Sequence, residues 1–327
     1  MQMGKSKHRT SRGRSRFRFR LWSAFCVVFA LSCALAVFAN VYGWLRREQQ
    51  VVLHFREMGG NVVFSSGRES GVDAVVDYLT CRRECIITLN GLNIRNDDMQ
   101  KVGFLTRPVA IGLDSTHVTD EGLHCVATAG TLRSLSLDDT AIGDRGIASV
   151  SGLPLLRRLS VRRTRITDAS LELLKHMDLE ILRIDGCAIT DRGMEAIREM
   201  KSLRTLGLRG TSISDEGLVG LPQLELTWLD LSGTPITDQG LRHIAQSPSI
   251  EYLDLSDTSI TSRGVSYFND FSSLTSINLR NTAIDDRVIP TLGSLFWLQS
   301  IDVRGTNVTP NGIMQLRQAH PMIIVAK

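Results

Sequence analysis

The sequence lacks the motifs that mark several common classes of enzyme. It contains no Walker phosphate-binding loop, no H-E-x-x-H zinc motif and no G-x-S-x-G nucleophile motif. Its seven histidines are scattered over unrelated positions, so they form no candidate catalytic or metal-binding pair. These absences exclude the enzymes that depend on such motifs. We expect a protein with no catalytic activity, no cofactor and no bound metal.

Cysteine is scarce, with six residues in 327. Cys81 and Cys85, in "CRREC", form a candidate disulfide in an oxidising compartment, and two unbridged thiols are the alternative. A zinc site would need two more ligands, and no nearby Cys or His pair supplies them. Cys125 and Cys187 are expected to be packing residues.

Acidic residues are absent from the first 20 positions, and charge of either sign is absent from residues 21–45. A 25-residue helix rising about 1.5 Å per residue is long enough for a hydrocarbon core of about 30 Å. Eight Lys or Arg precede it, which predicts a cytoplasmic N-terminus by the positive-inside rule. We therefore expect a basic cytoplasmic tail (1–20), a transmembrane signal-anchor helix (21–45) and a non-cytoplasmic remainder.

A cleaved N-terminus is the alternative. "ALA" at 34–36 resembles a signal-peptidase site and "ALSC" ending at Cys33 resembles a lipoprotein site, but the apolar run continues past both. The tail carries eight of the 38 basic residues and none of the 34 acidic ones, so the rest of the chain has a net charge of −4. This balance does not favour a repeat domain that binds nucleic acid.

After the apolar run the sequence repeats one phrase, with a polar column at a spacing of 23 or 24 residues. The column reads Leu92, Thr116, Thr140, Thr164, Cys187, Thr211, Thr234, Thr258, Thr282 and Thr306. Apolar residues occupy every copy three and five places before it, a strand pattern, and seven and ten places after it, a helical pattern. The repeats predict stacked strand–turn–helix units that share one core.

Polar residues in the turn have a predicted capping role. Thr, Ser or Asp three places after the column, and usually Asp at the fourth, offer oxygens to the N–H groups that open the helix. A calcium ladder is the alternative for the Asp column, and capping explains it without a cation. The Thr hydroxyls are expected to bond to free backbone groups or to stack on one another.

The pattern L-x-x-L-x-L-x-x-T-x-I-T-D-x-G-L resembles the leucine-rich repeat. "LEILRIDGCAITDRGM" (179–194) is similar to the cysteine-containing subclass of F-box proteins, and the whole chain resembles bacterial membrane-anchored leucine-rich-repeat proteins. The resemblance covers roughly residues 82–327. It implies an α/β solenoid, a right-handed horseshoe of about ten repeats, that binds other molecules. An F-box-like adaptor would need a helix bundle where the apolar run lies.

Both ends of such a solenoid need caps. Residues 46–81 are expected to form a juxtamembrane N-terminal cap, with a helix that ends at "MGG", a strand at "NVVF" and a second helix at "GVDAVVDYLT". The repeat domain then spans 82–327. Its C-terminal cap begins near residue 317, where a helix stops at Pro321 before a short apolar strand.

The variable residues of the strands are the candidate binding surface, because they point to the concave face. The expected basic centre contains Arg158, Arg162, Arg163, Arg183 and Arg209, and beside it lie Trp228, Asp230, Tyr252 and Asp254. Arginine and aromatic residues are enriched in binding hot spots, so we expect a protein partner, with an acidic surface or an envelope polymer as candidates. The alternative is a row of exposed ion pairs around Asp185, each contributing about 0–1 kcal/mol.

Overall fold

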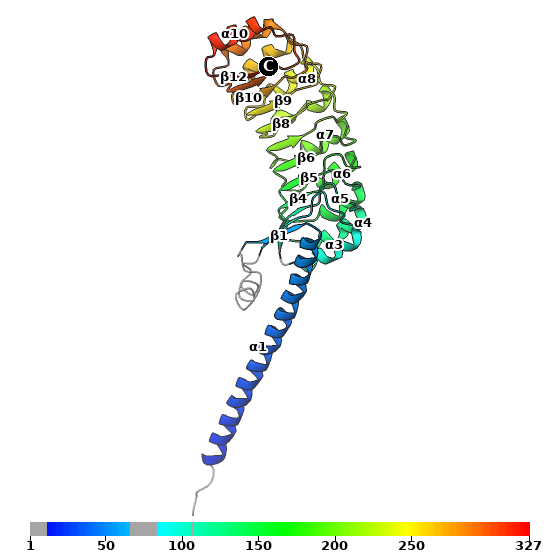
Figure 1. The fold of residues 1–327 in the computed structure, drawn as a ribbon. Coiled ribbons are helices and arrows are strands. Elements are labelled where there is room, and N and C mark those ends of the chain that lie inside the picture. Colours follow the sequence, from blue (N-terminus) through cyan, green and yellow to red (C-terminus); the bar gives the residue numbers. More distant parts are fainter. Residues whose placement is uncertain (1–11, 66–83, 106) are drawn as a thin grey trace, which may run out of the picture.

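The computed structural model describes residues 12–65, 84–105 and 107–327, with side chains from residue 25 onward. Within them, one parallel sheet runs along the whole arc and short helices cover its other side (Figure 1). The strands follow chain order from β1 to β12, and only β1 is antiparallel to its neighbour. This is the predicted leucine-rich-repeat solenoid.

Each repeat contributes one short strand to the sheet. The strands are β1 (Asn61–Phe64), β2 (Cys85–Thr88), β3 (Pro108–Gly112), β4 (Ser134–Ser136), β5 (Arg158–Ser160), β6 (Ile181–Arg183), β7 (Thr205–Gly207), β8 (Trp228–Asp230), β9 (Tyr252–Asp254), β10 (Ser276–Asn278), β11 (Ser300–Asp302) and β12 (Ile324–Ala326). From β3 to β12 neighbouring strands pair in register, so equivalent positions form straight rows across the sheet.

The returning segments are helices of one or two turns. They are α3 (Asn96–Val102), α4 (Asp120–Leu123), η1 (His124–Val126), α5 (Asp144–Val150), α6 (Asp168–Leu174), α7 (Asp191–Ile197), η2 (Asp215–Leu218), η3 (Leu221–Gln223), α8 (Asp238–Ile244), η4 (Gly264–Asp270), η5 (Asp286–Val288), α9 (Ile289–Ser294) and α10 (Pro310–Ala319). Helices this short are not stable alone, so their order comes from packing against the sheet.

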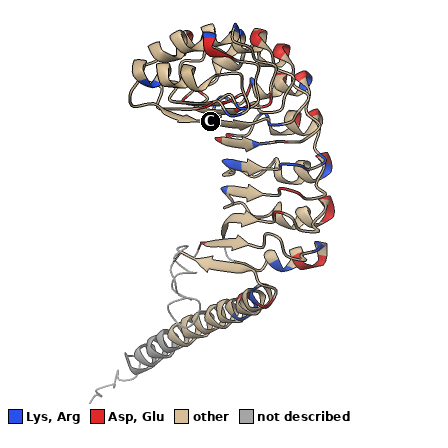
Figure 2. Ribbon diagram, turned by 45° about the horizontal axis from the view of Figure 1, so that its top comes forward, with Lys and Arg blue, Asp and Glu red and all other residues tan. Residues whose placement is uncertain are grey.

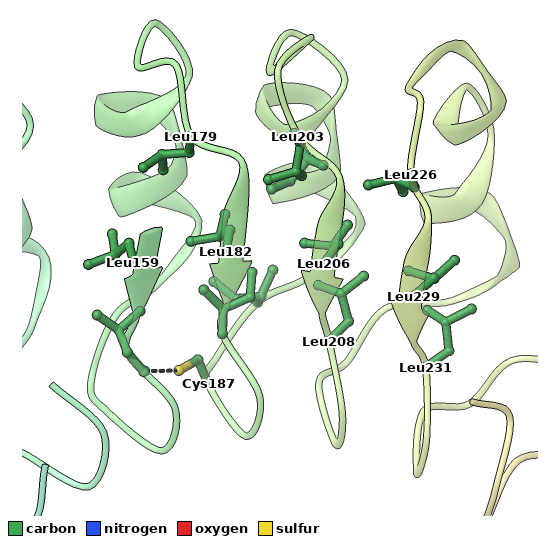
Figure 3. Packing of buried hydrophobic residues seen from close by; sticks show 14 of the residues in the cluster. Leu159, Leu179, Leu182, Cys187, Leu203, Leu206, Leu208, Leu226, Leu229 and Leu231 are labelled. Carbon is green, nitrogen blue, oxygen red and sulfur yellow. Dashed lines mark hydrogen bonds between the residues drawn. The ribbon is translucent and has the colours of Figure 1, made fainter. Parts of the chain in front are cut away.

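The core is a stack of identical leucine layers. Leu182, Leu206 and Leu229 lie side by side on successive strands and are fully buried, as Figure 3 shows for the centre of the arc. Cys187 fills a place held by Thr in most repeats, and its thiol donates to the carbonyl of Val161 at 3.1 Å. The predicted packing role of this cysteine is therefore confirmed.

The Thr column binds backbone within its own repeat. Thr211 Oγ1 donates to the carbonyl of Leu208 at 2.7 Å, and the other threonines of the column do the same three residues back. Of the two predicted roles for these hydroxyls, the bond to free backbone is the one observed in the described repeats. Each bond closes the turn that follows a strand.

The Asp column does not cap its own helix, which corrects the sequence-based interpretation. Asp168 at the start of α6 accepts from the backbone N–H (2.9 Å) and the hydroxyl (2.6 Å) of Thr190 in the next repeat. The side-chain cap of α6 comes instead from Thr167, one residue earlier. Five further aspartates bind the next repeat's turn in this way: Asp144, Asp191, Asp215, Asp238 and Asp286. Asp120 accepts only the backbone N–H of Gly143.

The N-terminal helix α1 (Arg12–Glu57) continues from the apolar run into the repeat domain without a break. Within the described chain, the segment Phe25–Glu57 is long and apolar enough to cross a membrane, a property shared by anchors and signal sequences. Its side chains are exposed from residue 25 to residue 40, whereas Phe55 is fully buried against the first repeat. The apolar run of α1 is thus exposed, whereas the last turns of the same helix pack against the repeat domain.

The structure describes part of each segment that was predicted to be a cap. Helix α1 ends before Gly59, which has a φ of +93°, and β1 follows as the antiparallel edge of the sheet. His54 of α1 joins Asp98 and Lys101 of α3, at 3.2 and 2.7 Å, and so ties the helix to the first repeat. At the other end β12 extends the sheet after α10. The predicted second N-terminal helix at 71–80 lies outside the described residues.

Candidate functional site

The concave face is made by three residues from each strand and the turn after it. These positions lie six, four and two places before the Thr column, and their side chains point away from the leucine layers. Because the strands pair in register, residues of one position lie on adjacent strands about 4.8 Å apart. Basic residues colour strands in the middle of the arc in Figure 2, where the sequence predicted the basic centre.

Two of the five predicted arginines are engaged by carboxylates. Arg162 donates its Nε to Asp138 at 2.7 Å and forms an ion pair with the same carboxylate. Arg163 forms an ion pair with Asp139, and this contact is the main reason that the pKa of Asp139 is lowered. These pairs neutralise one edge of the predicted basic centre.

The other three arginines have no ion pair in the described chain. They are Arg158 on β5, Arg183 on β6 and Arg209 in the turn after β7. Each is one strand further along and two residues later in its repeat, so the three form a diagonal row across the concave face. Arg158 and Arg209 are exposed, and Arg183 is half-buried. This diagonal row is the part of the basic centre that keeps its charge free.

Aromatic residues border the diagonal row. Trp228 and Tyr252 stack with ring centroids 5.3 Å apart and planes at 5°. The guanidinium carbon of Arg183 lies 5.4 Å from the centroid of the Trp228 ring, within the range of a cation–π contact. The predicted site residues Arg183, Trp228 and Tyr252 therefore meet, although Arg183 and Trp228 are separated by the whole of β7.

Three other carboxylates of this region, those of Asp185, Asp230 and Asp254, form no ion pair with arginine in the described chain. Asp185 accepts from the backbone N–H of Arg209 at 2.9 Å, and neither Arg162 nor Arg209 forms an ion pair with it. The row of salt bridges that was the alternative interpretation is therefore not observed around Asp185. Burial raises the pKa of Asp185 despite the nearby arginines.

Asp230 and Asp254 repeat this arrangement on β8 and β9. Asp230 accepts from the amide (2.8 Å) and hydroxyl (2.6 Å) of Ser232, and burial raises its pKa. Asp254 also accepts from Tyr252 and Asn278, at 3.3 and 2.8 Å. Burial and the charge of Asp254 raise the pKa of Tyr252 to about 12, so its hydroxyl stays protonated at neutral pH.

Gly207 is part of the site and was not predicted from the sequence. It lies on β7 between Arg183 and Asp230, its partners in the sheet. With no side chain at this point, the carboxylate of Asp185 lies against the Gly207 backbone, and Arg183 crosses here to reach Trp228; we call this point of the face the notch. The sequence did contain a signal for it: four places before the Thr column, the small Gly207 stands between the larger Arg183 and Asp230. Its meaning depends on which neighbouring side chain turns into the space.

The remaining chemistry of the described residues is sparse. No group of three or more His, Cys, Asp or Glu that could hold a metal ion occurs among them. Cys85 is buried in β2, while Cys81 lies in the part of the chain that is not described, so the candidate disulfide stays a prediction. One cavity in the described part, of about 230 Å³, is lined by Arg107, Cys125 and Thr131 among others.

Comparisons with known proteins agree with the repeat architecture. The family model for the leucine-rich repeat matches residues 131–151, 175–197, 226–245 and 246–268. With twelve strands in sequence order, these matches identify the chain as a leucine-rich repeat protein. No curated protein matches it significantly.

Solved structures similar to the chain include two internalins of Listeria monocytogenes. One internalin is 16% identical, with a TM-score of 0.48, over 74% of this chain and 86% of that chain. Internalin C2 is 24% identical, with a TM-score of 0.48, over 63% of this chain and 83% of that chain.

Proposed function

We propose that this leucine-rich repeat protein is anchored in a membrane by α1 and binds another protein through its concave face, without catalysis of its own. The repeats support binding, because solenoids offer extended concave surfaces for partners. The observation that carries the proposal is the diagonal row of Arg158, Arg183 and Arg209 beside the Trp228–Tyr252 stack. Arginine and aromatic residues together are typical of interface hot spots.

The membrane part of the proposal is supported by the exposed surface of α1. Phe25, Phe29 and Leu35 are 70%, 62% and 67% exposed, and a soluble protein rarely leaves so continuous an apolar surface in water. The basic tail before it favours a cytoplasmic N-terminus and a repeat domain on the other side. A secreted or lipid-anchored form would result from cleavage within the apolar run.

Partner capture tests the proposed binding face. Full-length protein would be crosslinked in cells and purified as wild type, as Arg158→Glu/Arg209→Glu, and as the control Arg145→Glu/Arg192→Glu. The control arginines are also exposed and unpaired in the described chain, but they lie on α5 and α7. We expect a protein partner that is lost only from the concave-face variant. Equal capture by all three forms would contradict the proposal.

The same experiment distinguishes an envelope polymer from a protein. Recovery of an acidic polymer that depends on Arg158 and Arg209 would keep the concave face as the site and replace the class of partner. All forms should first reach the membrane in equal amounts, so that a loss of binding is not a loss of protein.

A further inference from the structure

One carboxylate of the concave face has lost the partner that its equivalents have. Ser136 Oγ donates to Asp114 at 2.5 Å, and Ser160 Oγ donates to Asp138 at 2.6 Å, each from the strand that follows. Gly207 holds the corresponding place beside Asp185 and has no hydroxyl. A Cβ at Gly207 would lie 2.7 Å from Oδ1 of Asp185. The missing side chain thus lets the carboxylate of Asp185, which is 8% exposed, lie against the backbone at the notch.

Arg183 crosses this notch and is held there by stacking. Its backbone pairs with Gly207, and its guanidinium lies over the ring of Trp228, which in turn stacks on Tyr252. The Nε of Arg183 is buried and has no hydrogen-bond partner, and no hydrogen bond from its guanidinium is observed in the described structure. The terminal nitrogens of the guanidinium also lack an acceptor among the described residues, so a ligand that supplies acceptors to them gains free energy.

The shape and charge of the notch select the acceptor. A planar guanidinium matches a planar carboxylate, with which it forms two parallel hydrogen bonds. Asp185 and Asp230 flank the notch, and their negative charge repels a doubly charged phosphate more than a singly charged carboxylate. A carboxylate is therefore favoured over a phosphate.

We propose that the notch formed by Arg183, Gly207 and Trp228 binds the side-chain carboxylate of an Asp or Glu of a protein partner. This inference rests on the proposed function and specifies the chemistry of its site. Arg158 and Arg209 lie on either side of Arg183 in the diagonal row and attract the acidic segment, whereas Arg183 makes the bidentate contact. Exposed charges such as those of Arg158 and Arg209 act mainly on the association rate.

Site-specific crosslinking in the full-length protein tests the notch directly. A small diazirine amino acid would replace Thr205, two residues before Gly207 on the same face of β7. A second chain would carry it at Ser276, elsewhere on the concave face, and a third at Leu173, exposed on the helical side. After irradiation in cells, the crosslinked partner peptides would be sequenced by mass spectrometry. We expect peptides from position 205 that contain Asp or Glu within a few residues of the crosslink.

Matched variants separate recognition from general charge. Arg183→Lys keeps the charge but loses the planar pair of donors, and it should lower crosslinking at position 205 by about tenfold. Arg145→Lys is the control, because Arg145 is exposed on α5 and away from the concave face, and it should leave crosslinking unchanged. Gly207→Ser should also lower crosslinking, because its Cβ would lie 2.7 Å from Oδ1 of Asp185 and would push that carboxylate toward the path of Arg183. Circular dichroism would confirm that all variants are folded.

The outcomes decide between the inference and the proposed function. Crosslinks at Ser276 but not at Thr205, equal crosslinking by Arg183→Lys, or partner peptides without a carboxylate would overturn the notch and leave concave-face binding intact. A phosphate-bearing polymer at position 205 would also overturn it. Crosslinks only at Leu173, or at none of the three positions, would overturn both.

Discussion

At the scale of single residues, the phrase T-D-x-G-L describes a contact between repeats rather than a property of one turn. The Asp of each repeat reaches the turn of the next, and the Gly of that next repeat leaves room for it. A Cβ at Gly193 would lie 2.5 Å from Oδ1 of Asp168. Two exceptions follow the same logic: Ser170 replaces the Gly and donates to Asp144, and Val288 is tolerated where Ser262 replaces the Asp. The Asp and the Gly are therefore coupled across repeats.

This coupling predicts a non-additive pair of substitutions. Asp238 supplies all three of the atoms closest to a Cβ built at Gly264. We expect Gly264→Ala to lower the free energy of unfolding by about 1–3 kcal/mol through overpacking. In the Asp238→Ser background, which copies Ser262 and Val288, the same substitution should cost clearly less. Chemical denaturation of the four chains measures the difference.

The control for this pair is Gly152→Ala, because a Cβ at Gly152 would meet no atom within 4 Å. That variant should stay within about 0.5 kcal/mol of the wild type, as surface substitutions usually do. If Gly264→Ala costs the same with and without Asp238, the contact between the two positions is not what fixes the glycine.

Asp185 predicts an unusual dependence of stability on pH. Burial raises the pKa of its carboxyl in the folded protein, so ionisation destabilises the fold as the pH rises through the unfolded and then the folded pKa. Asp185→Asn keeps an acceptor for the amide of Arg209 without the charge. The variant should melt at a higher temperature than the wild type at pH 7. Its advantage should shrink as the pH falls toward the ordinary pKa of Asp, about 3.9.

The measurement is thermal melting of both chains from pH 7 to pH 3.5. Asp144→Asn is the matched control, because bonds from Ser170 and Thr167 outweigh burial and lower the pKa of Asp144. Its sign is opposite: the wild-type carboxylate stabilises the fold above the unfolded pKa, and this stability is lost as the pH falls through the folded pKa. An Asp185→Asn variant that is less stable at pH 7 would show that the carboxylate is better satisfied than its burial indicates.

At the scale of elements, α1 closes the N-terminal end of the solenoid core. Phe55 is fully buried against the first repeat, and Gly60 follows so closely that a Cβ there would lie 2.9 Å from the carbonyl of Phe55. The last turns of α1 therefore cover the end of the core, as a further repeat would. The same helix also carries the apolar run, which therefore continues without a break into the turns that pack against the first repeat.

Substitutions of a buried and an exposed apolar residue test whether the buried face of α1 holds the helix against the first repeat. Phe55→Ala should lower the free energy of unfolding by about 3–5 kcal/mol, because it empties a buried site. Leu53→Ala on the same helix should have little effect, because Leu53 is 57% exposed. Denaturant unfolding followed by circular dichroism compares them. Equal effects would mean that the cap is not held by the buried face of α1.

The elements were largely predictable because each column of the repeat carries an independent apolar constraint. The strand, the helix and the last strand at Ile324–Ala326 follow from period and from Pro321. The direction in which Asp168 bonds was not predictable, because its two neighbours, its own helix and the next turn, offer the same donors. Only the stacking distance between repeats decides between them.

At the scale of the whole molecule, the positions of the concave arginines follow from the repeat columns, but their ion-pair partners were not predictable. A list of columns puts Arg162, Arg183 and Arg209 in one basic zone. Whether each finds a carboxylate depends on rotamers: Arg162 turns back to Asp138, and Arg183 turns forward across Gly207 to Trp228. The sequence therefore predicts the surface, and side-chain geometry decides which charges remain available to a partner.

The arrangement of the whole chain predicts opposite sides for its two ends. Because α1 is continuous, and eight Lys or Arg with no acidic residue precede its apolar run, a cysteine in the tail and one in the repeats should lie on opposite sides of the membrane. Ser6→Cys and Arg192→Cys supply these two positions, and the unsubstituted chain gives the background from its own cysteines. In intact cells a membrane-impermeant maleimide should label Arg192→Cys, which is exposed on α7. It should label Ser6→Cys only after the membrane is opened.

The mass of the labelled protein gives the same experiment a second readout. An uncleaved anchor keeps Ser6→Cys attached to the repeats, so the two labels appear on chains of equal mass. Cleavage at "ALA" or before Cys33 would remove the tail and leave Phe55 in place, and the repeat domain would stay capped. Loss of the tail would therefore contradict the anchor without affecting the binding face. Labelling of Ser6→Cys in intact cells would reverse the topology and put the partner in the cytoplasm.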